Sequence, residues 1–156
     1  MDNIEIRGLN RLRFPNFGGK PTKYSPAGGA RSFGVWLEDD VAKQLDADGW
    51  HVGYYIPANN TENESRAYLT VKLRFDVYPP SIVCISDGRK QRLDENTVGI
   101  LDGLRFDNID LVIRPYVWGD IEKHEVSAYL KSGYFTFAQD EFAADYANIP
   151  DADIPF

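Results

Sequence analysis

The chain has 156 residues and a formal charge of −7, from 17 Lys and Arg against 24 Asp and Glu. This length favours one domain with its own core, and the 43% hydrophobic and 13% aromatic content excludes a wholly disordered chain. One cysteine, Cys84, excludes an internal disulfide framework and a Cys-based zinc cluster, and it fits a reducing cytoplasm. The sequence contains no run of about 18 apolar residues, so we expect no membrane-spanning helix. The first residues lack the apolar segment of a secretory signal.

The first half of the chain predicts mostly strands. In chain order we expect strands over residues 8–14, 31–37 and 50–56, a loop over 16–30, a short helix from Asp39–Asp40 to just before Gly49, and an exposed polar loop over 58–66. The first loop follows from four glycines and two prolines. Val41 and Leu45, four residues apart, are the expected buried face of the helix.

Residues 68–78 show the clearest alternation of the chain. Every second residue is apolar: Leu69, Val71, Leu73, Phe75 and Val77. The residues between them include Lys72, Arg74 and Tyr78, so this pattern predicts a strand with one buried face and one solvated face.

The second half adds more short strands. We expect strands over residues 81–86, 109–117 and 124–137, a turn at Asp87–Gly88, and a second short helix over 94–103 with Val98 and Leu101 inward. Six or seven strands at this spacing are typical of a small barrel or sandwich.

The negative charge is unevenly distributed. Residues 138–156 hold five acids and no base, which leaves 19 acids against 17 bases in the body. Residues 6–37 hold six bases and no acid, and Arg89, Lys90 and Arg92 form a second basic cluster. Such asymmetry indicates nucleic-acid contact in one part of a chain and a partner-binding tail in another, although a merely solvated surface explains it too.

Basic residues are interleaved with aromatic residues, as single-stranded nucleic acid requires. Cations contact the backbone, and flat rings stack on bases of any sequence. The candidate DNA-binding residues are Arg11, Arg13, Phe17, Lys20, Lys23, Tyr24, Arg31, Lys72, Arg74, Tyr78, Arg114, Tyr116, Trp118, Tyr129 and Lys131. Phe33, Trp36 and Phe75 are interpreted as core residues.

Patterns of enzyme chemistry are scarce. The sequence has no phosphate-binding loop and no dinucleotide fingerprint. His51 and His124 have no His or Cys at ligand spacing, so we expect no zinc site. Asp39, Asp40, Asp46 and Asp48 are candidates for a divalent metal, but two of them are interpreted as capping and solubilising the helix instead. We therefore expect no cofactor, no metal and no catalytic residue, with a small metal-dependent nuclease as an alternative.

The end of the sequence resembles the terminal peptide of bacterial single-stranded DNA-binding proteins, a run of aspartates followed by Ile-Pro-Phe. The matching residues are Asp151, Asp153, Ile154, Pro155 and Phe156, whereas Ala152 replaces a usual aspartate. The resemblance implies that these residues recruit replication or recombination proteins such as polymerase, primase, helicase or recombinase. A partner could hold the Phe156 ring in a pocket and pair the acids with basic side chains.

The body resembles phage-encoded single-stranded DNA-binding proteins. The similar segments are FPNFGGK (14–20), RSFGVWLEDD (31–40), DGWHV (48–52), LDENTVGILDG (93–103), NIDLVIRPYVW (108–118) and AYLKSGYFT (128–136). The resemblance implies a mainly β oligonucleotide/oligosaccharide-binding (OB) fold over residues 1–137, a partly open five-stranded barrel, followed by a flexible acidic tail over 138–156.

The implied function is sequence-tolerant binding of single-stranded DNA in phage replication or recombination, within the cytoplasm of an infected or lysogenic bacterial host. No membrane partner is expected. The sequence is compatible with both a monomer and a homo-oligomer. The alternative outside nucleic-acid binding is a structural or adaptor β-module of a phage.

Overall fold

The computed structural model describes residues 1–23, 25–56 and 65–137. Three predictions fall at least partly outside the described residues. They concern Tyr24, most of the loop expected over 58–66, and the acidic tail with its proposed partner-binding residues Asp151, Asp153, Ile154, Pro155 and Phe156.

The described chain consists mainly of β-strands. The strands are β1 (Ile4–Leu9), β2 (Arg13–Asn16), β3 (Ser32–Trp36), β4 (Val52–Tyr55), β5 (Arg66–Lys72), β6 (Ser81–Ser86), β7 (Arg89–Leu93), β8 (Phe106–Val117) and β9 (Val126–Phe137). The helices are α1 (Asp39–Ala47) and two 3-10 helices, η1 (Val98–Gly103) and η2 (Ile121–Lys123). None of these helices in the described part of the chain combines the length and apolar character of a membrane span.

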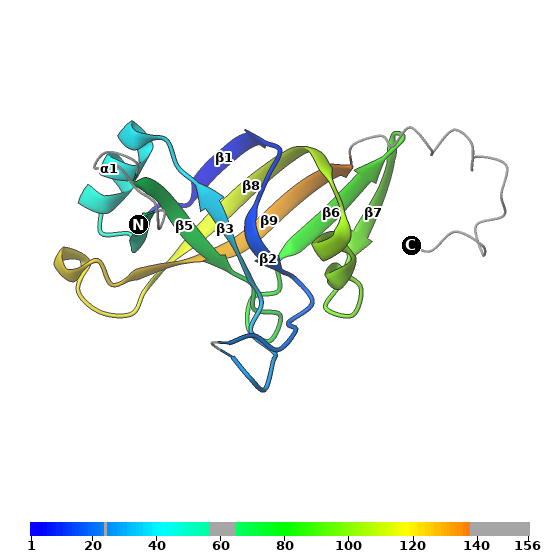
Figure 1. Cartoon of the computed structure of the whole chain (residues 1–156), viewed down its shortest axis with the longest axis horizontal. Coiled ribbons are helices and arrows are strands. Elements are labelled where there is room, and N and C mark those ends of the chain that lie inside the picture. Colours follow the sequence, from blue (N-terminus) through cyan, green and yellow to red (C-terminus); the bar gives the residue numbers. More distant parts are fainter. Residues whose placement is uncertain (24, 57–64, 138–156) are drawn as a thin grey trace, which may run out of the picture.

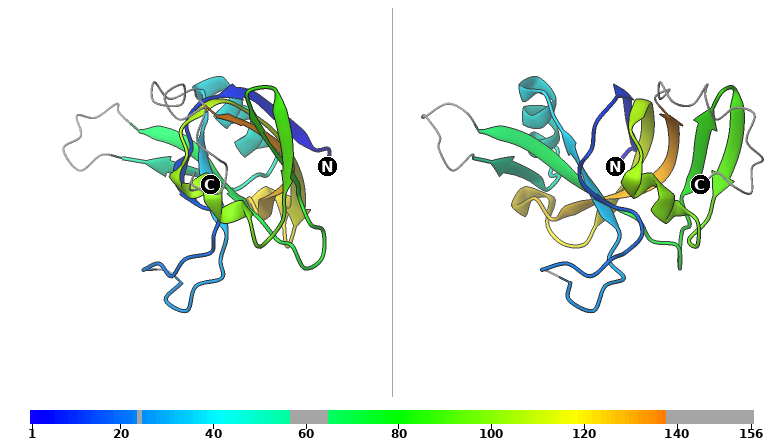
Figure 2. Two further views of the ribbon diagram at one scale, coloured as in Figure 1. Left: turned by 90° about the vertical axis from the view of Figure 1, so that its right-hand side faces the viewer. Right: turned by 45° about the vertical axis from the view of Figure 1, so that its right-hand side comes forward.

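The strands form one nine-stranded sheet that curves around the core (Figures 1 and 2). The main path runs β1-β8-β9-β5-β3-β2, while β4 pairs with β5, and β6 pairs with both β9 and β7. In Figure 1, α1 lies toward one end of the sheet and the β6–β7 hairpin toward the other. Among the described strands, β1 and β2 end the path and do not pair with each other.

Both expected strand numbers were too low. The sequence pattern predicted six or seven strands and the implied barrel has five, whereas the described sheet has nine. The first predicted strand, 8–14, is divided between β1 and β2, where residues 10–12 are not strand. The strand β7 was missed because four of its five residues, Arg89 to Arg92, are exposed, so the strand lacks the alternation by which a half-buried strand is predicted.

Strands β5, β8 and β9 carry the site described below. In β5 the expected alternation holds, with Ala67, Leu69 and Val71 buried. The strand ends at Lys72, however, so the predicted continuation to residue 78 is wrong, and Val77 is 58% exposed. Two consecutive prolines follow this segment, and proline cannot donate a ladder hydrogen bond.

In β9 a bulge changes the side that each residue faces. Val112 of β8 lies opposite Ser132, but Ile113 lies opposite Leu130, so Lys131 is an extra residue on β9. Buried residues alternate with solvent-facing ones from Val126 to Leu130. The alternation then shifts by one position, so that Gly133 and Phe135 are the next buried residues.

The helix predictions are confirmed in place but not in every detail. The α1 helix begins at Asp39 after the N-cap residue Glu38, whose side chain makes no capping hydrogen bond. Asp39 and Asp40 lie instead in the first turn, where a negative charge favours the helix dipole. Leu45 is buried together with Ala42, whereas Val41 is 41% exposed. The second expected helix is the shorter η1, with Val98 and Leu101 buried as predicted.

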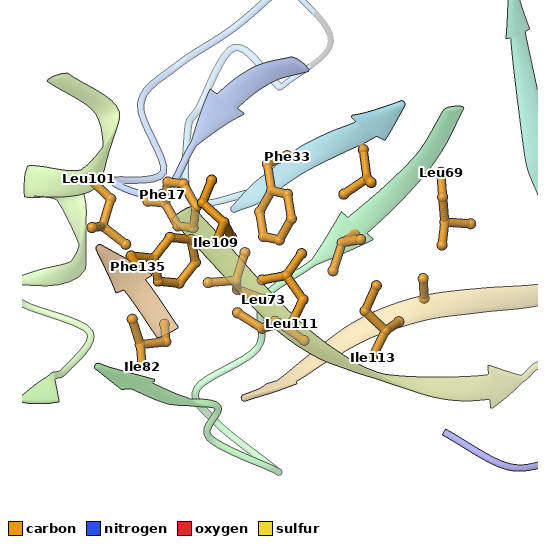
Figure 3. Packing of buried hydrophobic residues seen from close by; sticks show 14 of the residues in the cluster. Phe17, Phe33, Leu69, Leu73, Ile82, Leu101, Ile109, Leu111, Ile113 and Phe135 are labelled. Carbon is orange, nitrogen blue, oxygen red and sulfur yellow. The ribbon is translucent and has the colours of Figure 1, made fainter. Parts of the chain in front are cut away.

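The core lies on the inner side of the curved sheet (Figure 3). The Phe17 ring, which follows β2, stacks on Phe33 with 5.1 Å between ring centroids and meets Phe135 edge-on at 5.6 Å. Its backbone N–H donates to the Asp102 carboxylate at 2.6 Å, and this ties the start of the loop to η1. Cys84 is buried in the same core, and burial raises the pKa of its thiol.

Candidate nucleic-acid interface

Three strands bring a cation, a ring and a second cation into one row on the outer side of the sheet. Lys72 of β5 pairs with Tyr129 of β9, and Tyr129 pairs with Arg114 of β8. Their neighbours in each strand point into the core, so these three side chains lie on the solvent side. Adjacent strands are about 4.8 Å apart, so the row spans about 10 Å.

Further rings gather around this row. The Arg114 guanidinium lies 4.6 Å from the centroid of the Tyr78 ring and 5.6 Å from that of Tyr129. Tyr116, two residues after Arg114, meets Tyr129 edge-on with centroids 5.7 Å apart. Tyr78 is 63% exposed and Tyr116 50% exposed, so both rings are accessible to a ligand.

Arg74 adds a third cation that is partly neutralised. Its guanidinium makes two hydrogen bonds to Asp76, of 2.8 and 3.2 Å. These bonds hold the pKa of the Asp76 carboxyl below its usual value and raise the pKa of Arg74, to which Tyr129 adds a smaller contribution of the same sign. Asp76 is therefore a built-in competitor for any phosphate that approaches Arg74.

A shallow hollow of about 360 Å³ lies beside the row. It is lined by His51, Lys72, Tyr116, Trp118, Ser127 and Tyr129. Trp118 is 55% exposed, and the backbone N–H of His51 donates to the Val126 carbonyl at 3.0 Å, which places the start of β4 next to β9. The lining of the hollow thus combines two tyrosine rings and one tryptophan ring with one lysine.

We call this surface the β5–β9–β8 face. It unites seven of the predicted DNA-binding residues: Lys72, Arg74, Tyr78, Arg114, Tyr116, Trp118 and Tyr129. Lys131 is exposed two residues beyond Tyr129, at the bulge. The face combines exposed cations with exposed rings, which is the arrangement that single-stranded nucleic acid requires.

Other predicted residues lie elsewhere. Lys20, Lys23 and Arg31 belong to the loop between β2 and β3, which projects from the sheet in Figure 1. Arg31 donates to the Phe17 carbonyl at 2.8 Å, so its guanidinium supports the loop. Arg11 is exposed between β1 and β2.

The prediction that Phe17 contacts DNA is contradicted by its burial. Its side chain is 0% exposed and packs between rings of the core, so it presents no face to a base. The glycine-rich, basic surroundings of Phe17 suggested an exposed loop, but its burial depends on contacts with β3, β9 and η1 that are distant in sequence.

Arg13 belongs to a second group of cations and rings, which we call the Arg13 cluster. Its members, from β2 to β5, are Arg13, Phe14, Trp36, Tyr55, Arg66 and Tyr68. Sequence reasoning found only Arg13. Trp36 was interpreted as core, and Arg66 was placed in the exposed loop. The sequence did contain a sign of this cluster. Arg66, Tyr68 and Lys72 are separated by even numbers of residues, so in a single strand they face the same side, as they do in β5.

The model of a family described as a "putative phage ssDNA-binding domain" matches residues 1–155. The chain belongs to this family. The resemblance of the body to phage single-stranded DNA-binding proteins is thereby confirmed. The family consists of non-enzymatic DNA-binding proteins, which also confirms that the chain is not an enzyme.

Solved structures agree with the family in fold. The single-stranded DNA-binding protein from bacteriophage Enc34 in complex with ssDNA has a TM-score of 0.53 and 13% identity, over 90% of this chain and 89% of that chain. A second structure of the single-stranded DNA-binding protein from bacteriophage Enc34 has a TM-score of 0.51 and 12% identity, over 97% of this chain and 88% of that chain. This likeness shows a mainly β, OB-like fold. A comparison with curated proteins gives no match.

Proposed function

We propose that the chain binds single-stranded DNA on the β5–β9–β8 face, without strong sequence preference, during phage replication and recombination in the host cytoplasm. The observation that carries this proposal is the row Lys72, Tyr129 and Arg114, in which two cations flank a ring across three strands. The cations pair with phosphates, while Tyr78, Tyr116 and Trp118 offer faces on which bases stack. Family membership supports the ligand class.

A salt titration with oligo-dT tests this proposal. If phosphates are contacted, the logarithm of the association constant falls linearly with the logarithm of salt concentration, with a slope of about −0.7 per phosphate. Mixed-sequence oligonucleotides should bind within a few-fold of oligo-dT because stacking tolerates every base. An absence of binding at low salt contradicts the proposal. The same samples give the oligomeric state with and without DNA.

We further propose that residues 1–137 bind DNA and that residues 138–156 recruit other replication or recombination proteins. The support is compositional: five acids without a base, and an Asp-Ala-Asp-Ile-Pro-Phe segment that resembles a known recruitment peptide. Acidic and aromatic side chains are the groups that a basic pocket on a partner captures.

Deleting Asp151 to Phe156 tests the recruitment proposal. The shortened chain should bind oligo-dT at least as tightly as the full chain, because six residues with two negative charges are removed. Pull-down of purified host polymerase, primase, helicase and recombinase should lose at least one partner. A single Phe156→Ala variant separates the ring from the charge. Unchanged capture of every partner by the shortened chain contradicts the proposal.

A further inference from the structure

The Arg13 cluster is built around a guanidinium held among four rings. Arg13 lies 3.9 Å from the centroid of Tyr68, 4.7 Å from Phe14, and 5.4 Å from both Trp36 and Tyr55. A guanidinium stacked on rings is held in place with little further loss of rotamer freedom, and its N–H edges stay available for hydrogen bonds. The rings thus preorganise Arg13 for a bidentate contact with an anion.

Two glycines make room for this arrangement. A Cβ on Gly34, the cross-strand neighbour of Arg13, would lie 3.0 Å from the Arg13 Cβ. A Cβ on Gly53 would overlap the Tyr68 ring, so this ring can lie across β4 only because Gly53 has no side chain. The local sequence therefore keeps the sheet surface flat where the cluster is assembled.

Among the described residues, Arg13 has no carboxylate partner. Within residues 1–23, 25–56 and 65–137, the salt bridges are Arg7 with Glu5, Arg74 with Asp76, and His124 with Asp46. A second guanidinium, that of Arg66, lies 4.4 Å from the centroid of the Trp36 ring and adds positive charge. The cluster is in this respect better prepared for a phosphate than Arg74 is.

Phe14 is exposed at a backbone conformation that favours glycine. Its φ is 45°, and its side chain is 76% exposed. A bulky residue in the left-handed region costs free energy, and so does a phenyl ring in water. Neither cost is offset by core packing. An exposed stacking surface would account for both.

The Arg13 cluster and the β5–β9–β8 face share the outer side of β5. Arg66, Tyr68, Thr70 and Lys72 alternate with buried residues along this strand. Tyr68 lies between Trp36 of β3 and Gly53 of β4, and Lys72 lies between Ser32 of β3 and Tyr129 of β9. Tyr68 and Lys72 are four residues apart, which is about 13 Å along a strand. Thr70 is the small residue between them.

We propose that the Arg13 cluster is a second subsite for the same single-stranded DNA, reached by the strand as it continues along β5 from the β5–β9–β8 face. The inference rests on the proposed function and adds a location and a direction to it. Arg13 pairs with a phosphate, and the exposed rings of Phe14 and Tyr55 stack on bases. Footprints of about 4–16 nucleotides per OB fold accommodate both subsites.

The double variant Arg13→Gln/Phe14→Asn tests the second subsite. Its matched control, Arg105→Gln/Tyr134→Ala, also removes one exposed arginine and one exposed ring, outside both surfaces. With an oligo-dT of about 12 nucleotides, the test variant should lose about 5- to 150-fold in affinity, and its salt slope should shrink by about 0.7. The control should stay within about twofold of the unmodified chain.

The outcomes separate the two proposals. If the unmodified chain fails to bind oligo-dT, the proposed function itself is wrong. If it binds and the test variant matches the control, the second subsite is wrong. A change of oligomeric state in the test variant, with unchanged DNA affinity, also overturns the subsite, because the cluster would then be an interface between copies of the chain.

Phe14→Asn alone guards against a loss of binding that merely reflects unfolding. Asn tolerates a positive φ, so this variant should raise the melting temperature or leave it unchanged. It should nevertheless weaken binding to the oligo-dT of about 12 nucleotides. Unchanged binding together with unchanged stability overturns the stacking role of Phe14.

Discussion

The β5–β9–β8 face and the β6–β7 hairpin both carry cations on the outer side of the sheet, but of these two regions only the β5–β9–β8 face has rings directly beside its cations. On the β5–β9–β8 face, Arg114 contacts two tyrosine rings. On the β6–β7 hairpin, Arg92 lies opposite Val83. Continuing across the sheet from Val83, the next paired residue is Tyr134 of β9, followed by Asp110 of β8. Val83 thus separates Arg92 from the nearest ring in this row, and an acid lies beside that ring.

The difference shows that a cluster of charge in the sequence does not indicate which cations the fold places beside rings. Arg89, Lys90 and Arg92 were as conspicuous in the sequence as any cluster, yet the residues beside Lys90 and Arg92 on β6 are aliphatic. Cations without rings contact phosphates of any nucleic acid, single- or double-stranded. Cations beside exposed rings favour a strand whose bases are free to stack.

The largest expected effect comes from the ring at the centre of the row. Tyr129→Ala removes the side chain that contacts Arg114 and Tyr116 and so holds a phosphate ligand and a stacking ring in place. We expect a loss of about 5- to 150-fold in affinity for oligo-dT, because a stacked base contributes about 1–3 kcal/mol. Tyr134→Ala on the same strand is the control and should change affinity little. Equal losses in a fluorescence titration would abolish the distinction between the two surfaces.

A cation on the same face should matter less than the ring. Arg114→Gln should weaken binding by about 3- to 10-fold and reduce the salt slope by about 0.7, since one phosphate contact is lost. Arg92→Gln on the hairpin is the matched substitution. A titration at several salt concentrations distinguishes the variants, and an unchanged slope for Arg114→Gln would contradict its role as a phosphate ligand.

Removal of the Asp76 carboxylate, which competes with phosphate for Arg74, should raise the affinity for oligo-dT. Asp76→Asn frees Arg74 for phosphate, so we expect tighter binding by about two- to fivefold and a steeper salt dependence. Since Arg74 lowers the pKa of Asp76, this carboxylate stays ionised to a lower pH than an ordinary aspartate does. In the unmodified chain, Arg74 should therefore be released for phosphate only at acidic pH, where Asp76 is protonated. Weaker binding of the variant at neutral pH would show that the ion pair instead positions Arg74.

The smallest effect is expected from the hairpin. The triple variant Arg89→Gln/Lys90→Gln/Arg92→Gln should leave oligo-dT affinity within about twofold at physiological salt, where exposed charges act over about 8 Å. Its binding to double-stranded DNA should fall by more than its binding to oligo-dT. A large loss for oligo-dT would mean that the single strand also crosses β6 and β7.

How much could be predicted depended on how far a pattern extends along the chain. The β5 alternation identified Lys72 as exposed because each successive strand residue points to the opposite face. The same rule failed after Leu130, because the bulge at Lys131 arises from pairing with β8, and a single strand gives no sign of its partner's register. Phe17 failed for a related reason, since its burial requires Phe33 and Phe135.

The sequence by itself determined the mainly β class, the position of the helix, the separation of the acidic residues 138–156 from the body, and the mixture of cations and rings that single-stranded DNA requires. Only the tertiary structure decided which of those residues share a surface. Lys72, Arg114 and Tyr129 meet because β9 pairs in parallel with β5 and antiparallel with β8. Such pairings join residues far apart in sequence, and local patterns contain no information about them.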